Sequence, residues 1–549
     1  MNNKQSSHFV NLPKLNVNRS RFDLSFGNIT SFNTGQLIPM CQAIEILPGD
    51  TFKITTKSLV RLTTLAVPVF DNLFLDTYWF FVPYRLLWEH YVNFLGENDN
   101  SPWVNQTTYS IPQTTSPDGG WNVGTLADYF GIPTGVSNLS ISSLPFRGYA
   151  KIVRDWFYDE NLQIPPDFNV DDVTQAGSNG SDYVTDIIAG GVPFDLCKTH
   201  DVFTSCLPAP QKGASVSLPL GNNAPVYFGD VNQDIYKDYG NSRPIFGTKD
   251  SSDNVDVLTA GALGTNASGS FVFGSQASGT YSANIVNGYA DISSATATTI
   301  NDLRLAFQTQ RLLERMARGG TRYYEILASQ WGITPPQGII QRSEYLGGSR
   351  SKIDIQTVVQ TSETTNDSPL GDLAGMSVSY NKHQDFVKSF SEGGYLFGLC
   401  AVRYHHRYQQ GIPKSYLRKD LFDFYNHAFA YIGEQPIFNN QIYAQGTSQD
   451  TEVFGYNEAW VDYRYIPNQI TGQLRSSYNQ SLDKWHFADD YSSLPTLSSD
   501  WIKEDKSNVD RALVYSSGVV NQFIGEFYFD VDAVRPMPLY SIPGLIDHM

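Results

Sequence analysis

The stretch Ile44–Glu97 constrains the fold more than any other part of this chain. Residues 52–55 alternate between an apolar and a polar side chain, a period of two that predicts a strand with one wet face. The run Leu73–Val82 (LFLDTYWFFV) is almost continuously apolar and aromatic, which predicts a strand buried on both faces. Together the two predicted strands favour the wall of a large all-β protein.

Helical periodicity interrupts this β pattern in a few places. Pro83 and Gly96 stand where a helix would begin and end, and one helix face collects Tyr84, Leu87, Trp88, Tyr91, Val92 and Leu95. Residues 146–162 predict a short amphipathic helix. A stronger pattern over 299–318 begins with a T-x-x-D cap and is followed by a second helical piece through Tyr324, Leu327, Ala328 and Trp331.

The composition bounds the classes of function. The chain has 549 residues, 13% of them aromatic and 17% charged, with 32 Tyr and 33 Phe. Such values fit a protein whose surface is covered by partners, although β proteins in general use many aromatics. The formal net charge of −17 does not favour nucleic-acid binding by the chain as a whole, and assembly must rest on short-range contacts.

The cysteines and the amino terminus indicate a reducing compartment. Cys41, Cys197, Cys206 and Cys400 form no C-x-x-C pair, so a disulfide scaffold is not expected. The first residues show no signal-peptide pattern, and no run is long and apolar enough to predict a membrane span.

Two histidine-containing clusters are possible metal-binding or titrating sites. Cys197, His200 and Cys206 lack a fourth metal ligand at a usual spacing, which favours buried thiols and a surface histidine over zinc. His405–His406 lies between arginines that would repel a cation. These histidines are expected to be exposed or interface groups that gain protons at acid pH.

The sequence contains none of the common catalytic motifs. Phosphate-binding, dinucleotide-binding, zinc-protease, nucleophile-elbow and EF-hand patterns are all missing from the sequence. We therefore expect no enzymatic activity, no cofactor and no metal. The segments after residue 350, among them SKIDIQTVVQTS, YLFGLCAVRYHHRY, EAWVDYRYIP and NQFIGEFYFDVDAV, are predicted to form the remaining strands of a β-sandwich.

Two groups of basic residues are candidate contact sites. The start of the chain carries Lys4, Lys14, Arg19 and Arg21 and no acid before residue 23, which is either an ordinary solvated terminus or an arm that reaches phosphates or a neighbouring subunit. In the helix at 299–318, one face carries Arg304, Arg311, Arg315 and Arg318. We favour salt bridges to a neighbouring subunit for this face over phosphate contacts, and a solvated face remains the alternative.

Residues 258–299 differ from the rest in being rich in Gly, Ala, Ser and Thr, with Asp291 as the single charged residue. Low charge argues against a solvated disordered tail. We favour a projecting, partly structured loop domain over a flexible linker.

Several long segments of the sequence resemble those of a known family. RFDLSF (21–26), DTYWFFVPYRLLWEHYVNFLGEN (76–98), FTSCLPAPQKG (203–213), NDLRLAFQTQRLLERMARGGTRYYEIL (301–327) and RPMPLYSIPGLIDHM (535–549) occur in the order found in major capsid proteins of microviruses. The resemblance is to the gokushovirus-like branch of these small single-stranded DNA bacteriophages. It covers nearly the whole chain and is poorest at 214–298.

The resemblance implies a mainly β fold: an eight-stranded viral jelly roll with long loop insertions and a few short α-helices. It also implies a division into a basic arm (1–30), a first part of the jelly roll (31–213), a variable protruding insertion (214–298), and helices, remaining jelly roll and extended tail (299–549).

The functional implications are those of a virion component. The resemblance implies a T=1 icosahedral shell with one chain per asymmetric unit, assembled in the host bacterial cytoplasm around a circular single-stranded DNA genome. Implied partners are a small basic DNA-packaging protein, a minor or pilot capsid protein and a host surface receptor. Lys4, Lys14, Arg19 and Arg21 would face the DNA.

Two other classes of protein share parts of this pattern. A secreted β-rich carbohydrate-active enzyme or lectin would have the same Tyr and Trp content but would usually carry a signal peptide. A phage-tail protein or adhesin would favour internal repeats, and none is present.

Overall fold

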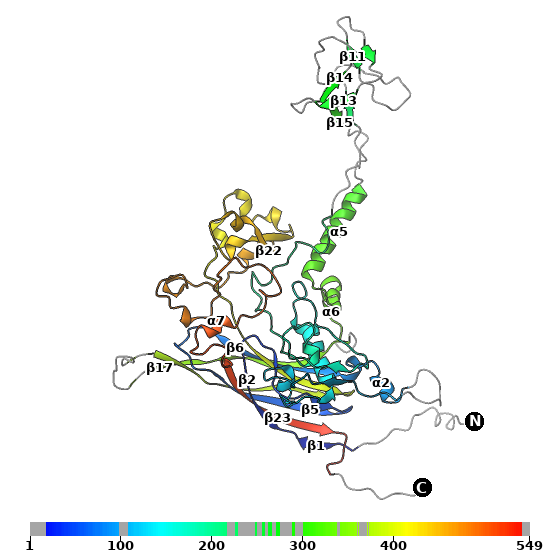
Figure 1. Ribbon diagram of the computed structural model, residues 1–549, viewed down its shortest axis with the longest axis vertical. Coiled ribbons are helices and arrows are strands. Elements are labelled where there is room, and N and C mark those ends of the chain that lie inside the picture. The colour runs from blue at the N-terminus through cyan, green and yellow to red at the C-terminus, as the bar shows by residue number, and fades with distance from the viewer. Residues whose placement is uncertain are drawn as a thin grey trace, which may run out of the picture. The chain divides into compact units, whose positions relative to one another are not determined.

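This computed structural model describes residues 18–97, 108–216, 300–336, 341–359, 361, 371 and 373–540, together with the backbone of short strands between 226 and 290 (Figure 1). The chain divides into two compact units. Unit 1 comprises Met1–Lys212 and Glu314–Met549, and unit 2 comprises Gly213–Leu313.

The first sheet of unit 1 has the order β1–β23–β5–β19, with β2 also paired to β23. All of these pairs are antiparallel. The strands are β1 (Ser20–Asp23), β2 (Phe26–Phe32), β5 (Thr51–Leu62), β19 (Ser379–Ser389) and β23 (Phe523–Arg535). In β5 the side chains alternate strictly between buried and accessible, as its period of two predicts.

The second sheet has the order β16–β6–β20–β3, with β4 also paired to β20. Its strands, again all antiparallel, are β3 (Ile38–Pro39), β4 (Ile44–Ile46), β6 (Leu73–Pro83), β16 (Glu344–Ile353) and β20 (Gly394–Tyr404). Because β1 and β2 share β23, and β3 and β4 share β20, each sheet has four strand positions. The predicted eight-stranded jelly roll is confirmed.

The main core lies between the two sheets. Trp79 of β6 is fully buried there, packs edge-on against Phe529 with ring centroids 5.5 Å apart, and donates its indole N–H to Thr56 Oγ1 at 3.2 Å. Opposite Trp79, β20 carries Gly398, where a Cβ atom would come within 2.8 Å of the indole ring. The close approach of the two strands therefore requires glycine at this position.

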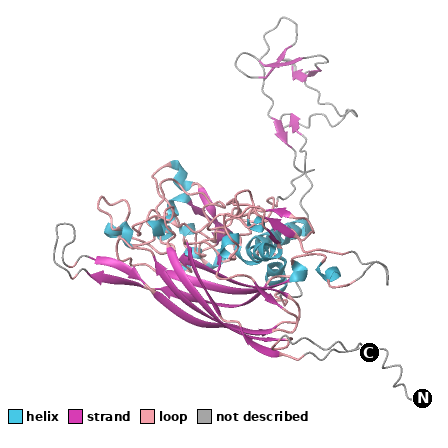
Figure 2. Cartoon of the chain, turned by 60° about the horizontal axis from the view of Figure 1, so that its bottom comes forward, coloured by secondary structure: helices cyan, strands magenta, loops and turns pink. Residues whose placement is uncertain are grey.

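A second core covers the outer face of the β6–β20 sheet. Alternate residues of these strands, such as Phe80 and Phe397, point away from the main core and pack under the insertion that follows β6. Helix α4 (Leu144–Ile152) crosses this face so closely that a Cβ on Gly148 would lie 2.2 Å from Phe397 Cζ. The predicted burial of Leu73–Val82 on both faces is thus confirmed, and Figure 2 shows helices and loops of unit 1 gathered on one side of the sheets.

The predicted helix over 83–95 is wrong. Strand β6 continues through Pro83, and only the short turns η1 (Tyr84–Leu86) and α2 (Tyr91–Phe94) are helical. Between them the backbone N–H of Glu89 donates to Val170 O at 3.0 Å, which draws the chain toward the insertion. The apolar spacing of the segment serves packing in the second core rather than one continuous helix.

The predicted strand EAWVDYRYIP is wrong as well. Strand β22 (Val453–Glu458) pairs with β21 (Glu434–Phe438) and ends just after this segment begins. Trp460 then takes a left-handed backbone conformation (φ 64°), and the turn η10 (Val461–Tyr463) follows. A positive φ cannot continue a strand.

The other predicted helices form. Helix α4 continues into a π-helical turn that ends at Phe157. Helix α5 (Ile300–Arg318) matches the 299–318 pattern, whose first residue lies outside the described part, and α6 (Tyr323–Ile326) runs into a π-helical turn ending at Trp331. No helix in the described part of the chain has the length and apolar character needed to span a membrane.

Smaller elements complete the described chain. In unit 1 they are α3 (Leu126–Tyr129), α7 (Ser507–Asp510), β7 (Gln113–Thr115), β8 (Ser140–Ser142), β9 (Gln175–Ala176), β17 (Ile355–Val359) and β18 (Leu373–Ser377). Unit 2 contains the short antiparallel pairs β10 (Val226–Phe228) with β15 (Gly288–Ala290), β11 (Gly247–Lys249) with β12 (Val255–Val257), and β13 (Ala262–Thr265) with β14 (Phe271–Gly274). The expected short strands are therefore present in this low-charge segment.

Candidate assembly surfaces

A group of large apolar side chains is exposed on the insertion between β20 and β23. Tyr431 is 98% exposed, Leu421 81% and Ile466 80%. We call the whole group the aromatic patch: Tyr416, Leu421, Phe422, Phe424, Tyr425, Tyr431, Ile432, Tyr463, Tyr465 and Ile466. Large contiguous apolar surfaces are uncommon on monomers and mark interaction sites.

The aromatic patch is held in place by buried charges beneath it. The Arg418 guanidinium pairs with Asp462 and lies 4.3 Å from the ring centroid of Tyr463 and 5.4 Å from that of Phe424. Lys414 Nζ approaches the same Asp462 carboxylate at 3.8 Å, and burial lowers the pKa of Lys414. These contacts order the rings before any partner arrives, which reduces the entropy lost on binding.

The rings of the patch also interlock with one another. The Trp460 indole N–H donates to Phe429 O at 2.8 Å, and Tyr425 packs edge-on against Trp460 at 5.7 Å. Tyr425 and Tyr463 lie 6.0 Å apart between centroids. These ring contacts join residues near 425 to residues near 460, which are distant in sequence.

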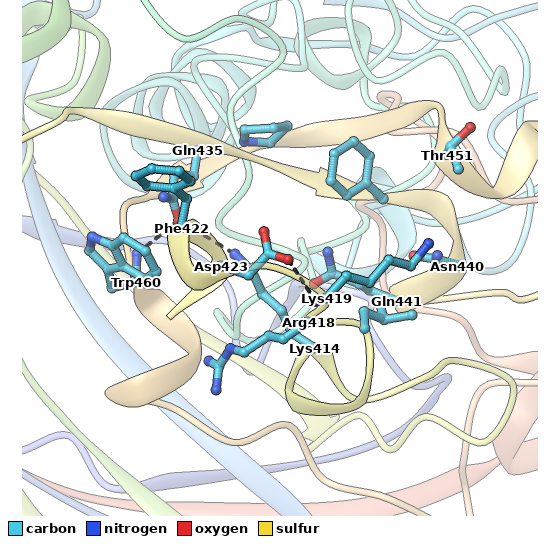
Figure 3. Close-up of a pocket in the computed structure, with 13 residues that line it drawn as sticks. Lys414, Arg418, Lys419, Phe422, Asp423, Gln435, Asn440, Gln441, Thr451 and Trp460 are labelled. Atoms are coloured by element: carbon cyan, nitrogen blue, oxygen red, sulfur yellow. Dashed lines mark hydrogen bonds between the residues drawn. The ribbon is translucent and has the colours of Figure 1, made fainter. Parts of the chain in front are cut away.

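A hollow of about 340 Å³ opens beside the patch (Figure 3). Phe422 and Trp460 form its apolar side, while Lys414 and Lys419 contribute cationic groups. Asp423 accepts the backbone N–H of Lys419 at 2.7 Å, and this backbone hydrogen bond and that from Asp420 lower the pKa of Asp423. The hollow therefore combines an apolar side with cationic and amide groups.

The four arginines predicted as interface residues differ in their contacts. Arg304, Arg311 and Arg315 are exposed on α5. Arg318 instead binds Glu434 of its own chain, and its Nη1 lies 3.4 Å from Glu458 Oε2. The apolar residues Leu305 and Leu312 on the same helix are exposed as well.

The basic arm is described in part. Lys4 and Lys14 lie outside the described residues, and Arg19 is exposed. Arg21 is on β1, where its guanidinium Nη2 lies 2.7 Å from Asp532 Oδ1, a contact that raises the pKa of Arg21.

The thiols of the C-x2-H-x5-C segment are directed to different partners. Cys197 Sγ is 3.4 Å from Gln163 Oε1, Cys206 Sγ is 3.3 Å from Val202 O, and His200 is exposed. Burial raises the pKa of Cys197 to about 12. Among the residues that the structure describes, no group of three His, Cys, Asp or Glu side chains is placed to hold a metal ion.

His406 is not an exposed or interface group, and that expectation is corrected. Its ring is fully buried, with Nδ1 3.0 Å from Asp489 Oδ1 and Nε2 2.9 Å from Glu504 Oε1. Burial lowers the pKa of His406, but the two carboxylates outweigh this and raise it to about 10. His405 lies edge-on to Phe74 at 5.2 Å, and burial lowers its pKa.

Jelly rolls of two antiparallel sheets occur in viral capsid proteins and in lectins. Here the outer face of the β6–β20 sheet is covered by the insertion that follows β6, and the aromatic patch is exposed to solvent. The fold and this surface are those expected of a structural protein that associates with other chains.

The comparison with known proteins identifies the family. Residues 10–545 match the model of the phage capsid protein (F protein), so the chain belongs to this family of structural, non-enzymatic capsid proteins. It is 43% identical over 540 residues to capsid protein VP1 of Spiroplasma virus 4, with 96% of each chain covered.

Two further relatives bear the same name. Capsid protein VP1 of Bdellovibrio phage phiMH2K is 40% identical over 539 residues, covering 98% of this chain and 97% of the relative. Capsid protein VP1 of Chlamydia phage 1 is 35% identical over 591 residues, covering 98% of each. The resemblance to capsid proteins of gokushovirus-like microviruses is confirmed, and the chain is a capsid subunit of the virion.

Proposed function

We propose that the chain assembles into a T=1 icosahedral shell, with one copy per asymmetric unit, around a circular single-stranded DNA genome. The aromatic patch carries this proposal, because it gives an acidic chain an uncharged, ordered surface for contact with a second copy. Contacts of this kind, repeated around closed symmetry axes, produce shells rather than fibres.

Electron microscopy of the purified full-length chain tests the shell. Uniform small spherical particles are expected, and fibres or persistent monomers would contradict the proposal. The patch itself is tested with Ile466→Glu, which places a charge in it. Val123→Glu is the matched control, because Val123 is also 80% exposed but lies in the insertion after β6. Only the first substitution should abolish particles.

The exposed arginines of α5 support a second contact. We propose that Arg304, Arg311 and Arg315 meet carboxylates of a neighbouring copy, and that Arg318, which is also bound to Glu434 of its own chain, adds its exposed part to this contact. Their charge opposes the net charge of −17 carried by each chain. Particle yield of Arg311→Glu, measured against salt concentration, tests the contact, and a yield equal to wild type would argue against it.

Residues 214–298 are proposed to protrude and to attach the virion to a host surface receptor. Support comes from their separation as part of a compact unit of their own and from the low charge of the stretch 258–299. Particles in which this segment is replaced by a short Gly-Ser linker should form but fail to adsorb to permissive cells. Normal adsorption would contradict the assignment.

The basic arm, residues 1–30, is proposed to face the genome through Lys4, Lys14, Arg19 and Arg21. Because its charge is small against that of the DNA, a small basic packaging protein supplies most of the neutralisation. A minor or pilot protein completes the virion, and assembly takes place in the bacterial cytoplasm. Trypsin should leave the arm intact in whole particles, whereas cleavage there would place the arm outside.

A further inference from the structure

The two sheets of the jelly roll differ in what covers them. The outer face of β6 and β20 is buried under the second core. The outer face of β5 and β23 is accessible along its whole length, since every second residue of both strands is exposed or half-buried. At about 3.4 Å per residue, β5 alone gives this open face a length of about 40 Å.

Charge is distributed unevenly over the open face. The carboxylates stand on β1 and β23: Asp23, Glu526, Asp530 and Asp532. The half formed by β5 and β19 carries no carboxylate on this side, and its cations are Lys53, Lys57, Arg61 and Lys382. This half is strongly basic in a chain whose net charge is −17.

Three of the four cations of the β5–β19 half form no ion pair within the described part of the chain, although Asp532 of β23 stands opposite Lys53 in the ladder. Lys57 pairs with Asp530 at 2.8 Å. For Lys53, Arg61 and Lys382, no ion pair occurs with any residue that the structure describes. Lys382 also stands directly opposite Lys57 in the ladder. Like charges in this arrangement weaken a sheet, and Asp530, which pairs with Lys57, offsets only part of the repulsion.

Two tyrosine rings flank these cations. Tyr380 of β19 is 65% exposed, and Tyr528 of β23 is exposed with Lys57 Nζ 5.1 Å from its ring centroid. Between the strands lies a shallow hollow of about 450 Å³. Its lining on β5 and β19 is Lys53, Thr55, Lys382 and Gln384, and Asp530 and Asp532 line its β23 edge. The face thus offers cations, aromatic planes and neutral polar groups side by side.

We propose that the β5–β19 half of the open face, together with Tyr528 of the adjacent β23, binds single-stranded DNA, with phosphates on Lys53, Lys382 and Arg61 and unpaired bases on Tyr380 and Tyr528. Aromatic rings on a basic sheet surface are the means by which proteins hold unpaired strands, because every base has a π face. A duplex hides its bases from such a platform. The inference rests on the proposed enclosure of a single-stranded genome and assigns the inner wall to this sheet.

Binding of a fluorescent oligo(dT) to the unassembled full-length chain, followed by anisotropy against salt, is the first test. The pair Lys53→Gln/Lys382→Gln should lower the slope of log affinity against log salt by about 1.4, from about 0.7 per phosphate contact. The control pair Lys484→Gln/Lys506→Gln removes the same charge from exposed lysines elsewhere and should leave the slope unchanged.

Base stacking is tested at Tyr380. Tyr380→Ala should weaken oligo(dT) binding about 5- to 150-fold, while Tyr380→Phe should retain it. If Tyr380→Ala has no effect and a duplex of equal length binds as tightly as the single strand, the face is a general polyanion surface and the proposal is overturned.

The DNA content of assembled particles distinguishes this DNA-binding proposal from the proposed shell function. Particles of Lys53→Gln/Lys382→Gln should assemble with a lower ratio of absorbance at 260 to 280 nm than particles of the lysine control pair. Normal particles with an unchanged DNA content would overturn the sheet assignment alone. A wild-type chain that forms no particles would instead contradict the proposed shell function.

Discussion

Replacing His406 with glutamine removes the cation from a buried cluster of charges. In the native protein His406 stands between Asp489 and Glu504, and all three side chains are nearly inaccessible to solvent. Lys198 Nζ lies 3.7 Å from the far oxygen of Asp489, and Asn508 donates to that carboxylate at 2.7 Å. After the substitution, Glu504 loses its cationic partner while it remains buried.

The expected cost is about 3–5 kcal/mol, the usual penalty for breaking one side of a buried ion pair. With an unfolding entropy of about 2.1 cal/mol/K per residue, a unit of several hundred residues should melt about 3–5 °C lower. The neighbouring substitution His405→Gln is the control, because His405 is exposed and lies edge-on to Phe74 rather than between carboxylates.

The stabilisation that His406 gives to the folded state depends on pH in a definite direction. The pKa of His406 is raised from 6.5 to about 10, so the folded state binds a proton that the unfolded chain releases above its own pKa. Its stabilisation is complete below about pH 6.5 and is lost as the pH rises toward 10. Scanning calorimetry of the unassembled chain from pH 6 to 10 should show the gap between wild type and His406→Gln narrowing. Melting within 1 °C of wild type at pH 6, or a gap that widens with pH, would refute this reasoning.

Three further predictions follow from packing and surface charge. Gly148→Ala should destabilise unit 1 by about 1–3 kcal/mol in chemical unfolding, although alanine normally favours a helix, because its Cβ would collide with Phe397; a stabilised variant would contradict the close crossing. Trp79→Phe should cost about 2–4 kcal/mol through lost volume and the lost hydrogen bond to Thr56, and an unchanged melting temperature would refute that packing. Arg318→Gln should destabilise the unassembled chain by about 1–3 kcal/mol, since Glu434 is buried, whereas exposed Arg315→Gln should change it by less than about 0.5 kcal/mol; equal effects would show that the Glu434 contact is unimportant.

Strands were predictable where burial imposes a simple period. The alternation at 52–55 and the apolar run Leu73–Val82 reflect one covered face and two covered faces, and both strands form as predicted. The helix expected over 83–95 fails because the same spacing of apolar residues also suits irregular chain packed into the second core. The strand expected at EAWVDYRYIP fails at a single left-handed residue, Trp460, which periodicity does not register.

The site was less predictable than the fold because its parts come from distant positions. The ion pairs of His406 join residues 83 and 98 positions away, so no local pattern reveals that it is buried. The aromatic patch unites residues near 420 and 463 through turns without helical or strand periodicity. Its available signal was the density of Tyr and Phe between Tyr416 and Tyr431, in a segment whose pattern predicts no core element. The cationic row on β5 and β19 depends on ladder register, which links positions more than 300 residues apart.

The position of β23 has a consequence for how incomplete chains behave. This strand lies between β2 and β5, yet it follows both of them in the sequence by more than 450 residues. Until it is made, β2 lacks its ladder partner and β5 keeps a bare edge, the kind of edge that attracts other strands. A chain that stops short of Phe523 cannot close its sandwich. A chain that lacks β23 is therefore expected to expose the unpaired edges of β2 and β5 and to associate through them instead of folding.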